Sequence, residues 1–304
     1  MSTPVSDKAP ASRFIDPKVL LRIQNLELVA RTVVEGFVQG LHRSPYMGFS
    51  VDFAAYREYM PGDEIRRIDW NVFGRSDRLY VKLYEGETNT RVLIMLDVSG
   101  SMNYGSTEVK KIDYARILAA SLSYFAHHQR DGVGLLTFDT DIRAHVPPSR
   151  RRGQMMTILS EIDRIQPSEQ TEFRKPLRFL AEYLTRRGVI VIISDLYDEP
   201  DNIIAGIKAL KAKGNDIIIF HIMDEFELTF PFEDMAQFED LETKKKLHVI
   251  PEYLRTQYLS ILKDHMDRIN KELSGIRVDY CLMNTSKPLD AGLFTYLAAR
   301  AKSV

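Results

Sequence analysis

Hydrophobic residues follow two alternating spacings along most of this chain. From Arg91 onward, short apolar runs of strand length lie at 92–97, 133–138, 189–194, 217–222 and 276–282. Segments with helical spacing lie between and after them, at about 110–128, 154–165, 174–186, 201–213, 253–273 and 289–301. Strands that alternate with helices predict an α/β fold, in which helices flank a mainly parallel sheet. Such sheets bind their ligands at the carboxyl ends of the strands.

The first ninety residues have a different pattern. Residues 1–14 are polar and predict a flexible tail. Asp16 followed by Pro17 is a helix start, and the helical spacing of apolar residues behind it predicts an amphipathic helix at 17–41. From Ser44 to Thr90, aromatic and β-branched pieces broken by turns predict a small β-rich element. We therefore expect a tail (1–14), a helical and β-rich N-terminal portion (15–89) and an α/β domain (90–304) with an inserted hairpin at 226–250.

Composition and charge narrow the functional classes. Of the 304 residues 44% are hydrophobic and 27% charged, as in ordinary globular proteins, and the net charge of −1 gives no reason to expect nucleic acid or an anionic membrane as partner. Cys281 is the single cysteine, which excludes an internal disulfide and a thiolate zinc cluster. The apolar runs are too short to span a bilayer, and the first fifteen residues lack the apolar core of a signal peptide. We expect a cytoplasmic protein.

The segment Asp97-Val98-Ser99-Gly100-Ser101 carries the clearest candidate chemistry. It comes where the first predicted strand of the sheet ends, and alternate residues leaving a strand point the same way, so Asp97, Ser99 and Ser101 converge. An oxygen-only ligand set suits Mg²⁺, Mn²⁺ or Ca²⁺ rather than zinc. Because the two hydroxyls are neutral, a bound cation would keep much of its positive charge and open positions for an incoming carboxylate.

These residues resemble the DxSxS signature of the metal-ion-dependent adhesion site of von Willebrand factor A domains. Upstream, Tyr56-Arg57-Glu58-Tyr59-Met60-Pro61-Gly62-Asp63 and Arg66-Arg67-Ile68-Asp69-Trp70 resemble the signature of a bacterial family of such domains with unassigned function. The resemblance covers about residues 40–300. Genes of that family tend to lie beside MoxR-type AAA+ ATPases, which implies such an ATPase, or its client, as the protein partner.

The resemblance also implies the rest of the metal site. A threonine from a later loop and an aspartate from a later strand complete it in the family. Thr171 matches the threonine, with Ser168 as its rival because Glu169 and Gln170 stand where many relatives have glycines. Asp195 matches the aspartate and Asp198 is the second candidate. The hydroxyls touch the metal in the family pattern, whereas the aspartates often act through water, so Asp97 and Asp195 are candidates for orienting waters.

Three functions fit these features. The first is a non-enzymatic module that binds an acidic side chain of a partner through its metal, in assembly or activation of protein complexes. The second is a metal-dependent, phosphatase-like hydrolase with the cation as Lewis acid, for which the sequence offers no general base beyond the aspartates. The third is a structural scaffold whose metal site has degenerated. Residues 100–107 imitate a phosphate-binding loop but have Ser106 where its lysine belongs, which argues against a nucleotide site.

Overall fold

The chain forms two compact units, Met1–Gly40 with Thr90–Val304 and Leu41–Asn89. The computed structural model describes residues 16–42, 56–58, 80–82, 90–166, 172–184, 186–233, 236–239, 246–249, 251–290 and 292–293. In the smaller unit it describes the antiparallel pair β1 (Tyr56–Glu58) and β2 (Tyr80–Lys82). The larger unit holds the sheet and the candidate site.

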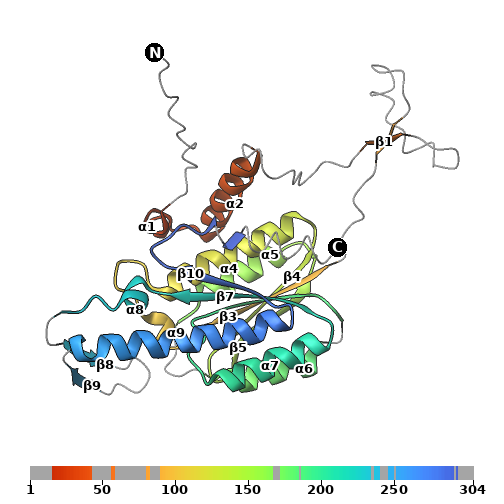
Figure 1. The fold of residues 1–304 in the computed structure, drawn as a ribbon. Helices are drawn as coiled ribbons and strands as arrows, with labels where there is room; N and C mark the ends of the chain where they lie inside the picture. The colour runs from red at the N-terminus through yellow and green to blue at the C-terminus, as the bar shows by residue number, and fades with distance from the viewer. Residues whose placement is uncertain are drawn as a thin grey trace, which may run out of the picture. The chain divides into compact units, whose positions relative to one another are not determined.

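A six-stranded sheet in the order β10-β7-β6-β3-β4-β5 is the centre of the larger unit (Figure 1). Five strands are parallel: β3 (Arg91–Asp97), β4 (Gly132–Phe138), β6 (Val189–Ser194), β7 (Asp216–Met223) and β10 (Asp279–Asn284). The edge strand β5 (Ile142–Ser149) runs antiparallel to β4. This mixed sheet with its helices confirms the predicted α/β class.

Helices cover both faces of the sheet, which explains why β3, β4 and β6 are nearly continuous apolar runs. The helices α6 (Arg174–Tyr183), α7 (Pro200–Ala212) and α9 (Pro251–Gly275) lie on one face. Their core side chains, such as Leu177, Ile207 and Ile269, join Leu93 and Ile192 of the sheet in one hydrophobic cluster. The helices α4 (Lys111–His128) and α5 (Gln154–Asp163) lie on the other face (Figure 1).

Three sequence-based predictions of elements need correction. The single helix at 17–41 is two helices, α1 (Pro17–Leu21) and α2 (Leu26–His42), because Asn25 Oδ1 accepts a hydrogen bond from Leu28 N and starts a new helix. The strand placed at 276–282 is β10, which begins three residues later because a turn after α9 places Arg277 at a φ of 58°. The edge strand β5 was not expected.

The helix start predicted at Asp16 and Pro17 is confirmed. Asp16 caps α1 by accepting from Lys18 N, and Pro17 is in its first turn. Within 226–250 lie most of α8 (Glu225–Thr229) and the antiparallel strands β8 (Ala236–Glu239) and β9 (Lys246–Val249). Most of the helix predicted at 289–301 lies outside the described residues.

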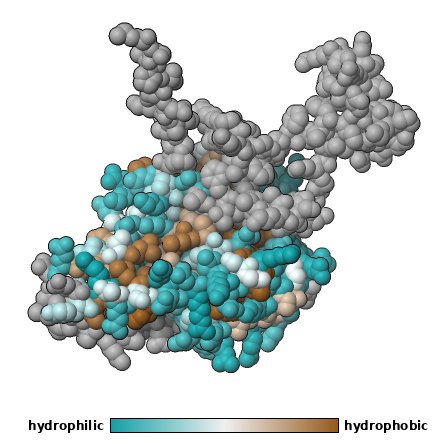
Figure 2. All heavy atoms as spheres, in the orientation of Figure 1, coloured by the Kyte–Doolittle hydropathy of each residue, from teal (hydrophilic) through white to brown (hydrophobic). Residues whose placement is uncertain are grey.

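The visible surface is mainly hydrophilic (Figure 2), as expected for helices that turn their apolar side chains towards the sheet. Figure 2 shows hydrophilic side chains over much of the visible face, with a group of hydrophobic ones near its centre. Among the described residues, no helix is both long enough and apolar enough to cross a membrane.

Candidate functional site

The central strand β3 delivers Asp97 to the carboxyl edge of the sheet. Six of its seven residues are fully buried between β4 and β6, and Asp97 itself is 0% exposed. Beyond the strand, Val98 N donates to Phe138 O at 2.8 Å, which keeps the chain beside β4 for one more residue. The fold therefore holds a carboxylate inside the protein at the edge where α/β sheets bind ligands.

The two serines converge with Asp97 as the sequence predicted. Ser99 N donates to Asp97 Oδ1 at 2.9 Å, a side-chain turn that curls the backbone back on the carboxylate. The Oγ atoms of Ser99 and Ser101 are 3.1 Å apart. Ser99 is buried, whereas Ser101, the first residue of the short helix η2 (Ser101–Asn103), is half-buried. The hydroxyl pair thus leads from the interior to the surface.

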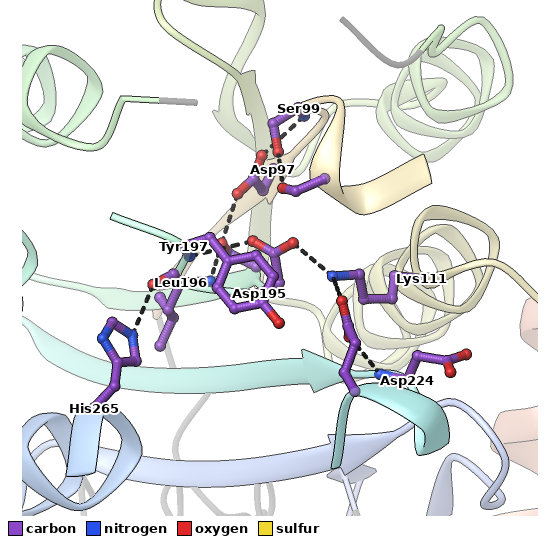
Figure 3. Close-up of polar contacts among 11 residues, drawn as sticks. Asp97, Ser99, Lys111, Asp195, Leu196, Tyr197, Asp224 and His265 are labelled. Atoms are coloured by element: carbon purple, nitrogen blue, oxygen red, sulfur yellow. Dashed lines mark hydrogen bonds and ion pairs between the residues drawn. The ribbon is translucent and has the colours of Figure 1, made fainter. Parts of the chain in front are cut away.

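Strand β6 brings a second polar segment to the same edge. Ser194 Oγ donates to Asp97 Oδ2 at 2.6 Å and accepts from Leu196 N at 2.9 Å. Leu196 has a φ of 54°, a left-handed conformation unusual for leucine, and its carbonyl lies 3.1 Å from His265 Nε2. Asp195, fully buried, comes between them and accepts from Tyr197 N (Figure 3). Asp97 and Asp195 therefore lie on neighbouring strands at one edge.

Lys111 is a further residue of this site and was not among those predicted from the sequence. Its Nζ lies 2.8 Å from Asp195 Oδ2 and 2.7 Å from Glu227 Oε1, and its side chain is fully buried (Figure 3). The Tyr197 ring lies 4.6 Å from the same nitrogen, within cation–π range. Lys111 precedes the buried residues Tyr114 and Ala115 by three and four positions, so all three lie on the buried face of α4. This helical spacing was the signal in the sequence that Lys111 is buried.

Burial and neighbouring charge set the pKa values of the site. Burial raises the pKa of Asp97 to about 7, and the nearby charge of Asp195 acts in the same direction, while hydrogen bonds from Ser194 and Ser99 oppose it. Burial opposes the charge of Lys111, but the carboxylates of Asp195 and Glu227 outweigh it and raise the lysine pKa. Lys111 is thus matched by its two carboxylates, whereas no lysine or arginine among the described residues forms an ion pair with Asp97.

Of the remaining predicted ligands, the structure describes only Asp198. Thr171 and its rival Ser168 lie outside the described residues. Asp198, the second candidate after Asp195, accepts hydrogen bonds from Phe173 N at 2.9 Å, from Glu199 N and from Asn202 Nδ2. Its carboxylate therefore joins the start of α6 to the start of α7. Asp195, not Asp198, is the aspartate whose charge acts on Asp97.

The donor set fits a small divalent cation. Two ligands at right angles on Mg²⁺, each about 2.1 Å from the ion, are about 3.0 Å apart, close to the 3.1 Å between the serine hydroxyls. A buried carboxylate with a raised pKa beside them is a group that a cation would stabilise. The described residues hold no group of three or more His, Cys, Asp or Glu side chains suited to a metal, so any cation here needs the hydroxyls.

This mixed sheet, with an aspartate and paired serines at its carboxyl edge, has the arrangement expected of a von Willebrand factor A-type domain. The chain belongs to the family described as protein of unknown function DUF58, whose family model matches residues 55–268. Uncharacterized proteins of Mycobacterium bovis and of Mycobacterium tuberculosis strain H37Rv are each 23% identical to it over 293 residues, which cover 94% of this chain and 91% of the relative.

Solved structures similar to this chain include the conserved hypothetical protein BatB from Bacteroides thetaiotaomicron. That similarity has a TM-score of 0.48 and 14% identity, and it covers 71% of this chain and 100% of that one. The VWA domain of SpRpn10 is similar with a TM-score of 0.41 and 14% identity, over 68% of this chain and 94% of that domain.

Proposed function

We propose that this protein is a non-enzymatic, metal-dependent protein-binding module. Asp97, Ser99, Ser101 and Asp195 would hold a Mg²⁺, Mn²⁺ or Ca²⁺ ion, with Thr171 as a further predicted donor. The observation that carries the proposal is the 3.1 Å separation of the Ser99 and Ser101 hydroxyls beside the buried carboxylate of Asp97.

The charge arrangement favours binding of an anion over hydrolysis. The hydroxyls add no negative charge, and one oxygen of Asp195 already accepts a hydrogen bond from Lys111. A cation held there would keep part of its charge and attract a carboxylate. Ser101 is half-buried, so the open position would face the surface beside it. An aspartate or glutamate of a partner protein is the ligand that fits this position.

The family resemblance supports a MoxR-type AAA+ ATPase, or the client that such an ATPase remodels, as the partner. The module would then act in the assembly or activation of another protein complex. Sedimentation of the chain with a purified MoxR-type ATPase, with Mg²⁺ and with EDTA, tests this part of the proposal separately. We expect a complex that chelation dissociates.

The metal site is tested by comparing the wild type with Ser99→Ala. Mg²⁺ and Mn²⁺ should raise the melting temperature of the wild type and leave that of Ser99→Ala unchanged. Ser106→Ala is the matched control, because Ser106 follows in the same loop and its buried Oγ has no hydrogen-bond partner among the described residues. A pull-down from native lysate, with and without EDTA, should lose its partners in the same variant. A partner set that survives both changes contradicts the proposal.

One observation favours an alternative, the metal-free scaffold. Lys111 neutralises Asp195 without any metal. If neither cation shifts the melting temperature or binds by calorimetry, the scaffold is the better description. Phosphoester turnover that disappears in Asp97→Ala would instead support the hydrolase.

A further inference from the structure

A cavity of about 290 Å³ lies at the amino-terminal edge of the sheet, opposite to the serine pair. The first residues of β3 and β6, the end of α6 and the two prolines of β5 line it. Its volume is just below the range of about 300–1,000 Å³ that is typical of small-molecule pockets. One bulky side chain fits it better than a cofactor does.

Apolar side chains contribute to the floor of the cavity, and two glycines allow the segments around it to approach closely. Leu93, Leu184 and Ile190 lie among its lining residues. A Cβ on Gly188 would lie 2.5 Å from Arg91 O, so glycine allows β6 to begin close to β3 there. A Cβ on Gly134 would lie 2.6 Å from Pro148 N, so glycine also lets the prolines fold over β4.

Asn215 is the one uncharged amide side chain in the lining, and its hydrogen-bonding groups are engaged. Its Oδ1 accepts from Gly188 N at 3.1 Å, and its Nδ2 donates to Leu210 O at 3.0 Å. These two bonds leave the amide little capacity for an occupant, and burying a polar group without a partner is costly. An apolar group therefore suits the floor best.

The rim, in contrast, is positively charged. Arg91 and Arg186 line the cavity and are exposed. The same edge of the sheet gathers Arg151 and Arg152, which follow β5, and Arg187, which precedes β6. None of these five arginines has an ion pair within the part of the chain that the structure describes. Nearby acids are engaged elsewhere: Glu182 lies 3.5 Å from Arg178, and Asp216 lies 3.3 Å from Lys211.

We propose that this cavity docks an acidic peptide segment of a partner protein. One leucine or aromatic side chain of the segment enters the cavity, and flanking Asp or Glu carboxylates pair with Arg91 and Arg186. Tyr183, 41% exposed at the rim, offers a further aromatic contact. Five arginines along one edge suit an extended anion better than a small one. The apolar side chains at the floor suit an aliphatic or aromatic side chain better than the polar edge of a nucleobase, so a peptide fits better than nucleic acid. The site is independent of the proposed metal.

Selection of random twelve-residue peptides displayed on phage tests this proposal. The full chain should enrich sequences in which a bulky apolar residue is flanked by acidic residues. A synthetic peptide of that pattern should bind at least about tenfold more weakly to Arg91→Glu/Arg186→Glu, as expected for the loss of charge-assisted hydrogen bonds. Binding should also weaken with rising salt.

Two controls make the result decisive. Arg164→Glu/Lys175→Glu makes the same charge change at exposed positions away from the cavity and should leave peptide binding unchanged. Ser99→Ala should also bind the peptide normally, so failure of the metal proposal would not affect this result. No acidic enrichment, or equal binding by the rim variant, overturns the proposal. So does tight binding of labelled oligo(dT) that the rim variant abolishes, since the edge would then bind nucleic acid.

Discussion

Lys111 Nζ lies 2.8 Å from Asp195 Oδ2, and both side chains are fully buried. A buried ion pair resists the loss of one partner, because the remaining charge is left without compensation in the interior. We therefore expect Lys111→Met to reduce the free energy of unfolding by about 3–5 kcal/mol, measured by urea denaturation. Lys110→Met, at the exposed neighbouring position, should change it by less than about 1 kcal/mol.

The coupling between the two side chains can be tested with a double variant. In Lys111→Met/Asp195→Asn the unfolding free energy should fall by less than the sum of the losses in the two single variants. Additive losses would show that the pair is not coupled.

Ser194 stabilises the buried carboxylate of Asp97 through the 2.6 Å hydrogen bond and also accepts from Leu196 N. Ser194→Ala leaves both groups short of a partner, so we expect a loss of about 1–3 kcal/mol in unfolding free energy. Ser123→Ala is the matched control, since Ser123 is equally buried and its Oγ has no hydrogen-bond partner among the described residues. That change should be neutral or stabilising. Equal effects of the two substitutions in thermal unfolding would contradict the role given to Ser194.

Two glycines in helices should respond to alanine in opposite directions. A Cβ on Gly206 of α7 would lie 2.4 Å from Leu177 Cδ1 and 2.9 Å from Leu177 Cβ, whereas around Gly36 of α2 there is open space. Gly206→Ala should destabilise the protein, because overpacking costs about 1–3 kcal/mol and outweighs the gain in helix propensity. Gly36→Ala should stabilise it by about 0.5–1 kcal/mol. The melting temperatures of both variants check the packing between α6 and α7, and a stabilising Gly206→Ala would contradict it.

His221 gives the protein a predictable sensitivity to acid. Burial lowers its pKa from 6.5 to about 4, so the ring is neutral in the folded state where the unfolded chain already binds a proton. The contribution of His221 to stability, about 3 kcal/mol in total, is therefore lost as the pH falls from about 6.5 to about 4, whereas the raised pKa of Asp97 acts in the opposite direction over the same range. Relative to the wild type, His221→Gln should therefore have an unfolding free energy that falls less, or rises more, as the pH is lowered through this window. The exposed His128→Gln should leave the slope as it is, and an equal slope in all three proteins would refute the assignment.

The sheet and the core of the site could be predicted because their signals are local. The strands β3, β4 and β6 are nearly continuous apolar runs, since both of their faces are covered. The spacing of Asp97, Ser99 and Ser101 after a strand predicts their convergence. The edge strand β5 gave no such signal. Its residues are half-buried except Arg143 and Pro147, which are exposed, so no buried face stands out, and Pro147 and Pro148 argue against a strand.

Lys111 could not be assigned a partner from the sequence for a different reason. It contacts Asp195 and Glu227 across 84 and 116 residues, and only the folded sheet brings these segments together. Charged residues at helix starts are ordinarily solvated, so the pattern favoured a surface position. The left-handed conformation of Leu196 could not be predicted from the sequence either, since it depends on hydrogen bonds to neighbouring residues and not on the residue type.

The two prolines of β5 affect whether the sheet edge can pair with a strand of another molecule. An exposed edge strand can template aggregation, because its free N–H and C=O groups pair with a strand of another chain. Pro147 and Pro148 have no N–H to offer, and the ladder between β4 and β5 already shifts register beside them. Neighbouring residues of a strand point their N–H groups to opposite sides, so one of two successive prolines lies where a strand added beyond β5 would need a donor. This edge is therefore protected against intermolecular strand addition by its own sequence.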